Sequence, residues 1–165
     1  FTDNGRDWIS DDLPPDELNH ISEPDLDFGF PYCHGGFLQD IDFPIENPCE
    51  GTIPPAFAFQ AHVAPLGITF YTGDTFPEDY QNAIFVAEHG SRNRTSPVGY
   101  RVSVITFDDS SEITDYEIFI EGFLQSDRDY DAWGRPVDIL NMPDGSLLIS
   151  DDRGDAIYRV QYTGE

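Results

Sequence analysis

Short apolar runs alternate with polar turns over residues 133–162, WGRPVDILNMPDGSLLISDDRGDAIYRVQY. The runs Val137–Leu140 and Leu147–Ile149 predict two strands. Pro143-Asp144-Gly145 between them is typical of a tight turn, because proline presets φ and Asp-Gly tolerates positive φ. An acidic turn at 151–155 leads into Ala156–Tyr162, where alternation with period two predicts a third strand. Such a meander cannot bury both of its faces alone and needs neighbours of the same kind.

The same unit recurs earlier in the chain. Twice more an apolar run ends on an acidic residue and is followed by a polar loop and a further strand. The strands predicted in this way are Phe1–Asn4, Glu17–Ile21, Leu66–Tyr71, Phe85–Glu88, Tyr100–Phe107 and Asp115–Ile120. A short helical turn is expected at Phe76–Tyr80, and residues 32–60 read as a long irregular connection. Repeated meanders with their loops on one face are typical of the blades of a β-propeller, and an ordinary β-sandwich is the alternative.

The composition agrees with an all-β domain. The 165 residues include 13 Phe, 8 Tyr, 14 Gly and 13 Pro, which is enough aromatic surface for a core and many turns. No apolar run approaches the roughly 20 residues of a membrane helix, so no membrane span is expected. The chain starts at Phe1, without an initiator Met, within what reads as the second strand of a blade. We therefore expect residues 1–165 to be the C-terminal part of one propeller domain, truncated at its N-terminus.

The charge is strongly unbalanced. The chain has 32 acidic residues, eight Arg and no Lys, with a net charge of −24. Nucleic acid is excluded as a partner, because a phosphate backbone needs cations opposite it. Solubility at high salt and a set of cation sites are the two interpretations that remain, and the spread of acids along the whole chain favours the first.

Two cysteines, Cys33 and Cys49, lie 16 residues apart in the loop-rich stretch. A disulfide between them would contribute roughly 3 kcal/mol by the chain-entropy relation. Free thiols or a metal pair are the alternatives, although no second cysteine pair could complete a zinc site. The disulfide is the favoured interpretation, and with it an exported protein.

Several polar residues are candidates for ligand binding. The loop after Asn4-Gly5 is rich in acids whose oxygens could bind a hard cation such as Ca²⁺, or could simply be solvated. His34 and His62 are single histidines, which are more often structural than ligands. Arg92 and Arg94 concentrate positive charge in one loop of an acidic protein, which indicates either an anionic ligand or local salt bridges.

A family resemblance joins these features. The motifs FTDNGRDW, DDLPPDELN, FGFPYCHGG, HVAPLGITFY, IFVAEHGSRNR, EGFLQ and WGRPVDILNMPDGSLLISDD resemble, in this order, the glucose/sorbosone dehydrogenase family. Members of that family are soluble sugar dehydrogenases that depend on pyrroloquinoline quinone (PQQ) and have a six-bladed propeller. The resemblance covers nearly all of the chain but only about the C-terminal half of the family domain, which implies about three blades built from four-stranded antiparallel meanders.

The resemblance implies calcium ligands at the start of the chain. Two consecutive backbone carbonyls that hold the cofactor calcium in the family match Gly5 and Arg6. An acidic pair that helps to bind a separate structural calcium matches Asp16 and Glu17.

The resemblance also implies contacts with PQQ. The residue before the V-A-P motif falls at His62, and an Arg that pairs with a PQQ carboxylate matches Arg135. A basic residue of the loop after the preceding blade's second strand matches Arg94 best, while Arg92 stands where the family usually has an aromatic. Gly5 and Arg6 would contact the cofactor through its calcium.

The chemistry follows from the residue types. Calcium polarises the quinone carbonyl as a Lewis acid, arginines hold the carboxylates of PQQ, and a general base takes the proton of the sugar hydroxyl. That base is a His of the N-terminal half in the family, so no catalytic residue is assigned here. The resemblance implies a periplasmic or secreted enzyme that oxidises an aldose or sorbosone-type sugar and passes electrons to an external acceptor such as a cytochrome.

The same residues leave an alternative of another class, a propeller module that binds a ligand or protein without redox activity. Convergence of Gly5, Arg94 and Arg135 at one channel mouth would favour the cofactor site. The segment alone should need either the missing N-terminal half or a second copy, because an open half propeller exposes sheet faces and edges.

Overall fold

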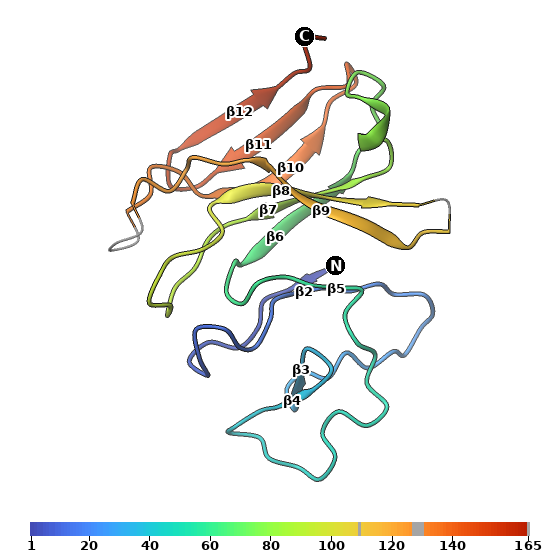
Figure 1. Cartoon of the computed structure of the whole chain (residues 1–165), viewed down its shortest axis with the longest axis vertical. Helices are drawn as coiled ribbons and strands as arrows, with labels where there is room; N and C mark the ends of the chain where they lie inside the picture. Colours follow the sequence, from blue (N-terminus) through green and yellow to red (C-terminus); the bar gives the residue numbers. More distant parts are fainter. Residues whose placement is uncertain (109, 127–130, 165) are drawn as a thin grey trace.

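The structure of the protein is a computed structural model that describes residues 1–108, 110–126 and 131–164. Its regular structure consists of β-strands and one 3₁₀ turn, η1 (Glu78–Tyr80). Within these residues, three antiparallel sheets of three or four strands and one two-stranded hairpin follow one another along the long axis of the molecule (Figure 1). Within the described residues, no helix is long and apolar enough to cross a membrane.

The middle sheet is a complete four-stranded meander. It contains the strands β6 (Pro65–Phe70), β7 (Ile84–Glu88), β8 (Arg101–Phe107) and β9 (Ile113–Ile120), in sequence order. All five residues of β7 and four of β8 are buried, whereas β6 is mostly half-buried and β9 is half-buried to exposed, so burial falls from the two central strands to the edges. This gradient is expected for a blade whose inner strands are covered by the neighbouring blades.

The C-terminal sheet has three strands in the order β10 (Pro136–Asn141), β11 (Leu147–Asp151) and β12 (Ala156–Val160). Met142 and Gly145 close the β10–β11 turn with a 2.9 Å backbone hydrogen bond, and Gly145 has a φ of +79°. The Asp-Gly turn is therefore confirmed, as are the three strands around it.

The N-terminal sheet is built from short pieces. It pairs β1 (Thr2–Asp3) with β2 (Glu17–Leu18), and β2 with the distant β5 (Phe57–Ala58). The connection at 32–60, expected to be irregular, also contains the hairpin of β3 (Cys33–His34) and β4 (Leu38–Gln39). The sequence could not indicate these two-residue strands, because they depend on partners far along the chain or across a glycine turn.

The expected disulfide is present between Cys33 and Cys49. It closes the segment that contains the β3–β4 hairpin and forms the lower end of the molecule in Figure 1. The prediction of an all-β propeller fold is confirmed, and among the described residues only the middle sheet has the expected four strands.

The core lies between the sheets. One cluster joins the middle and C-terminal sheets and includes Tyr71, Phe85, Leu147 and Ile149, which are almost completely buried. A second cluster joins the middle and N-terminal sheets. Its buried members are Leu18, Phe59, Val63, Ile84, Val86 and Ile105. Burial of each such side chain contributes roughly 1.5–3 kcal/mol, so stacking of neighbouring sheets stabilises the fold.

The connections β1–β2, β5–β6, β7–β8 and β11–β12 lie on the same side of the molecule, the left side in Figure 1. We call this side the loop face. Almost all of the predicted site residues lie in these connections or next to them.

Candidate functional site

Asp16 braces the β1–β2 connection on the loop face. Its two carboxylate oxygens accept hydrogen bonds from the backbone N–H of Gly5 (2.6 Å) and Ala64 (2.7 Å). Burial raises the pKa of Asp16 to about 6, although these N–H donors act in the opposite direction. Gly5 is required for the close approach, because a Cβ there would lie 2.6 Å from the carbonyl oxygen of Pro15.

The carbonyl oxygens of Gly5 and Arg6 are the predicted ligands of a cofactor calcium. Among the described residues, no hydrogen-bond donor reaches either oxygen. In the same part of the chain, no three side chains of His, Cys, Asp or Glu are grouped so as to hold a metal ion. A calcium ion would therefore depend on backbone carbonyls, which are ligands that hard cations accept.

His62 lies next to this loop and is almost completely buried. Its Nε2 lies 2.8 Å from the carbonyl oxygen of Ser10, so Nε2 must carry the proton and donate it. Its Nδ1 is buried without a hydrogen-bond partner, and the nearest carboxylate oxygen, on Asp7, is 4.0 Å away. A buried polar atom without a partner costs about 1–3 kcal/mol, so Nδ1 is a position where a ligand could supply the missing hydrogen bond.

Arg94 extends from the β7–β8 connection onto the β1–β2 connection. Its guanidinium donates to the carbonyl oxygens of Asp11 and Ala61, and it lies 3.3 Å from the carboxylate of Asp12. Arg94 therefore ties three connections together on the loop face. The contact of Arg94 with PQQ, which the family resemblance implies, stays a prediction.

Arg135 precedes β10 and holds the same β7–β8 connection from the other side. Its side chain donates to the carbonyl oxygens of His89 (3.0 Å) and Gly90 (2.7 Å) and lies over the ring of Tyr100. Its backbone N–H donates to Asp151. Arg94 and Arg135 thus meet the same loop, and both already bond backbone carbonyls.

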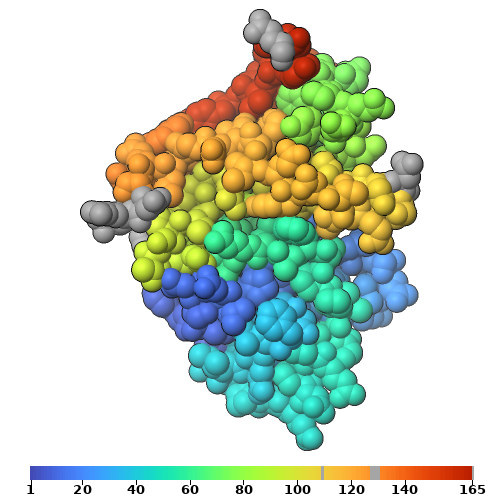
Figure 2. Space-filling view, viewed as in Figure 1, coloured from blue at the N-terminus to red at the C-terminus, as the bar shows by residue number. Residues whose placement is uncertain are grey.

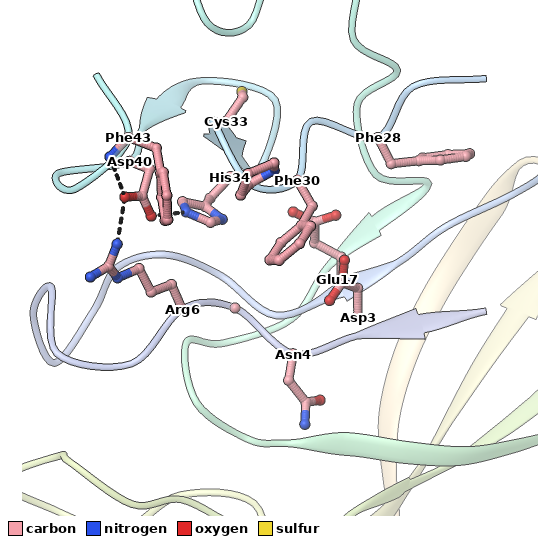
Figure 3. A pocket seen from close by; sticks show the side chains of 12 residues that line it. Asp3, Asn4, Arg6, Glu17, Phe28, Phe30, Cys33, His34, Asp40 and Phe43 are labelled. Carbon is pink, nitrogen blue, oxygen red and sulfur yellow. Dashed lines mark hydrogen bonds and ion pairs between the residues drawn. The ribbon is translucent and has the colours of Figure 1, made fainter. Parts of the chain in front are cut away.

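The side chains of Arg6 and Glu17 point elsewhere, into a cavity of about 300 Å³ between β1, β2 and the disulfide-closed segment (Figure 3). Arg6 forms ion pairs with Asp40 and Asp42. Glu17 accepts hydrogen bonds from the backbone of Gly35 (2.7 Å) and the side chain of Asn19 (2.9 Å). The side chains of the predicted pair Asp16 and Glu17 therefore point in different directions, as expected where an extended chain enters β2 at Glu17.

Asp40 is a buried acid that no sequence pattern identified as a candidate. It accepts a hydrogen bond from the backbone of Asp42 and lies 2.8 Å from Nε2 of His34. Burial would raise the pKa of Asp40, but the hydrogen bonds from His34 and Arg6 outweigh it and hold the pKa well below its usual range. Asp40 thereby joins the β1–β2 connection to the disulfide-closed segment.

The hydrogen bonds connect Gly5, Asp16, His62, Arg94 and Arg135 through adjacent loops. Their arrangement offers two carbonyl oxygens without donors, one buried imidazole nitrogen without a partner, and two arginines at the same loop. These groups could hold an anionic ligand together with a hard cation. Gly5, Arg94 and Arg135 thus lie in or contact neighbouring loops of the loop face, and their role as a cofactor site stays a prediction.

Similar propeller folds occur among solved structures. The calcium structure of the Trichoderma reesei Carbohydrate-Active Enzymes Family AA12 protein matches 95% of this chain with 22% identity and a TM-score of 0.74. The holo form of the pyranose dehydrogenase PQQ domain from Coprinopsis cinerea matches 98% with 19% identity and a TM-score of 0.70. The match covers 46% and 49% of those chains, respectively, and at these identities it shows the fold.

The family model described as TrAA12-like matches residues 37–163, and the chain belongs to this family of AA12 PQQ-dependent oxidoreductases. A curated protein of Borreliella burgdorferi (strain ATCC 35210 / DSM 4680 / CIP 102532 / B31), described as uncharacterised, is 46% identical over 164 residues. That alignment covers 98% of this chain and 43% of the relative, so the chain spans less than half the length of the relatives it matches.

Proposed function

We propose that this chain is the C-terminal part of a PQQ- and calcium-dependent dehydrogenase that oxidises a hydroxyl group of an aldose or sorbosone-type sugar. The family and the propeller fold support the reaction class. The observation that carries the proposal is the buried Nδ1 of His62, which has no hydrogen-bond partner and lies 4.0 Å from Asp7, the residue that follows the donor-free carbonyls of Gly5 and Arg6.

Different residues would bind the calcium ion and the anionic PQQ. The carbonyl oxygens of Gly5 and Arg6 would hold calcium, and Arg94 and Arg135 would face the carboxylates of PQQ. The bound cofactor supplies an electrophilic quinone that accepts a hydride from the sugar. Asp16 keeps the calcium loop in place through its bonds to Gly5 and Ala64.

The remaining parts of the reaction would lie outside this chain. We propose that the base that takes the hydroxyl proton belongs to an N-terminal half of the parent protein and that the electron acceptor is an external protein such as a cytochrome. The Cys33–Cys49 disulfide supports a periplasmic or secreted location, because such bonds persist in oxidising compartments.

The proposal is tested with the complete parent protein. Dye-linked oxidation of a panel of aldoses, with and without added PQQ and Ca²⁺, should show activity only when both are present. His62→Phe should weaken PQQ binding, measured by fluorescence titration, because a phenyl ring has no nitrogen to accept the hydrogen bond. Activity without either cofactor, or PQQ binding unchanged by His62→Phe, would contradict the proposal.

A second candidate is a propeller module that binds a ligand without redox activity. The bonds of Arg94 and Arg135 to backbone carbonyls favour it, since both side chains already have a structural role. Absence of PQQ binding by calorimetry, in a parent protein that is folded and calcium-loaded, would support this second function.

A further inference from the structure

An apolar patch lies on the disulfide-closed end of the molecule. Within residues 30–45, six large apolar side chains are exposed, a density that exceeds that of any other described segment of this length. We call these six residues the apolar patch. They are Phe30, Tyr32, Phe37, Ile41, Phe43 and Ile45, and Phe30 is 77% exposed.

The patch is continuous at its centre. The rings of Tyr32 and Phe43 make an edge-to-face contact at 6.4 Å, and Phe30 and Phe43 line the same cavity (Figure 3). In Figure 2 the segment that carries the patch forms the lower end of the visible face, separate from the C-terminal sheet. Clustered exposed apolar side chains of this kind mark interaction surfaces.

Carboxylates are frequent in and next to the segment that carries the patch, and others line the cavity beneath it. Six exposed acids lie within this segment or close to its ends in the sequence: Glu23, Asp25, Asp27, Asp42, Glu46 and Glu50. Asp3 and Glu17, opposite one another in the β1–β2 pairing, line the cavity beneath the rings. Residues 7–91 contain no Lys or Arg, and the nearest arginine, Arg6, is paired with two aspartates.

The negative charge around the patch indicates which kind of partner would bind there. A second copy of the chain would bring another surface with a net charge of −24 against it, which is unfavourable. A protein with a basic surface around an apolar centre would match both features, because complementary charge increases the association rate and fixes the orientation.

We propose that the apolar patch and its acidic surround form the docking surface for a small basic electron-transfer protein, the acceptor of the dehydrogenase proposed above. This inference rests on that function. Oxidation of one sugar hydroxyl to a carbonyl releases two electrons and two protons. A one-electron carrier must therefore dock and leave twice in each turnover, which suits a surface that binds through screened charges and a modest apolar centre.

The test measures reduction of a lysine-rich cytochrome c by the complete parent protein, with a small redox dye as the reference acceptor. Glu46→Lys/Glu50→Lys should lower the second-order rate constant for the cytochrome about tenfold, and raising the salt to about 0.2 M should have a similar effect on the unchanged protein. Ile41→Ser/Ile45→Ser should weaken cytochrome binding about tenfold. Dye reduction should stay the same in both double variants.

The matched controls lie on the exposed outer strand β9. Glu117→Lys and Ile118→Ser make the same kinds of change there and should leave cytochrome reduction within about twofold of the parent. Cytochrome reduction that is unaffected by the patch variants, or affected equally by the controls, would overturn the proposal.

Two further outcomes identify other occupants and would also overturn it. If the patch variants lower Tm by more than about 5 °C while Ile118→Ser does not, the patch is covered by the parent chain itself. If they convert a dimer into a monomer in light scattering, the occupant is a second copy. Should the parent protein show no dye activity, the enzymatic function fails. Calorimetric titration with cytochrome c, using Glu46→Lys/Glu50→Lys and Glu117→Lys, then still decides whether the surface docks a basic protein.

Discussion

Replacement of Arg135 by alanine tests how the loop face would hold an anionic cofactor. The change removes two hydrogen bonds from a charged donor, to the carbonyls of His89 and Gly90, and the contact of the guanidinium with the ring of Tyr100. Hydrogen bonds from charged groups contribute about 1.5–3 kcal/mol each, and a cation–π contact contributes about 0.5–1 kcal/mol at an exposed site. Because Arg135 is only half-buried, the lower values apply, and the β7–β8 connection should lose interactions worth about 3.5 kcal/mol.

The consequence for PQQ is a weaker complex. Loss of the proposed contact with a cofactor carboxylate should by itself weaken PQQ binding by about 2–3 kcal/mol, which raises the Kd roughly 30- to 160-fold. The assay is a fluorescence titration of the complete, calcium-loaded parent protein. Arg135→Lys should recover only part of the loss, because an ammonium cannot reproduce the planar fork of a guanidinium.

Arg159→Ala is the matched control, since Arg159 is an exposed arginine of β12 that pairs with Asp144 and Ser146. It should bind PQQ as the parent does. A titration curve for Arg135→Ala that coincides with that of Arg159→Ala would refute the reasoning, provided that circular dichroism shows both variants folded.

Three other changes test the fold around the site. Serine at both Cys33 and Cys49 should lower the free energy of unfolding by about 3 kcal/mol in urea, because the closed loop regains its freedom in the unfolded chain; an unchanged midpoint would contradict this. The folded-state pKa of Asp40 lies below the unfolded value of about 3.9, so its stabilisation exists above that pH and is lost as the pH falls through the folded pKa. Asp40→Asn should therefore destabilise the neutral protein and weaken its acid dependence, whereas parallel stability–pH curves would exclude this role. Gly5→Ala should reduce calcium affinity in isothermal titration, because its Cβ would displace the Pro15 carbonyl; unaltered affinity would move the calcium site away from this loop.

Local pattern was sufficient for the regular strands. The period-two alternation at 156–160 and the apolar runs at 84–88 and 147–151 became strands, because hairpin partners lie close in sequence and the turn residues between them have few alternative conformations. Proximity in a loop-rich segment was likewise enough to predict the Cys33–Cys49 bond. The family motifs located the loops where cofactor residues were expected.

Only the tertiary structure decided which side chains meet. The pairing of β2 with β5 spans about forty residues, and the bonds of Asp40 to Arg6 and His34 bring together two loops that no local pattern relates. The opposite directions of the side chains of Asp16 and Glu17, at the start of β2, depend on which face of this two-residue strand packs against the next sheet. Sequence by itself thus determined strands, turns and charge, which depend on neighbours in the chain. Contacts between distant segments exist only once the sheets are stacked. These contacts decide which side chains are buried, which form ion pairs, and in which direction each functional side chain points.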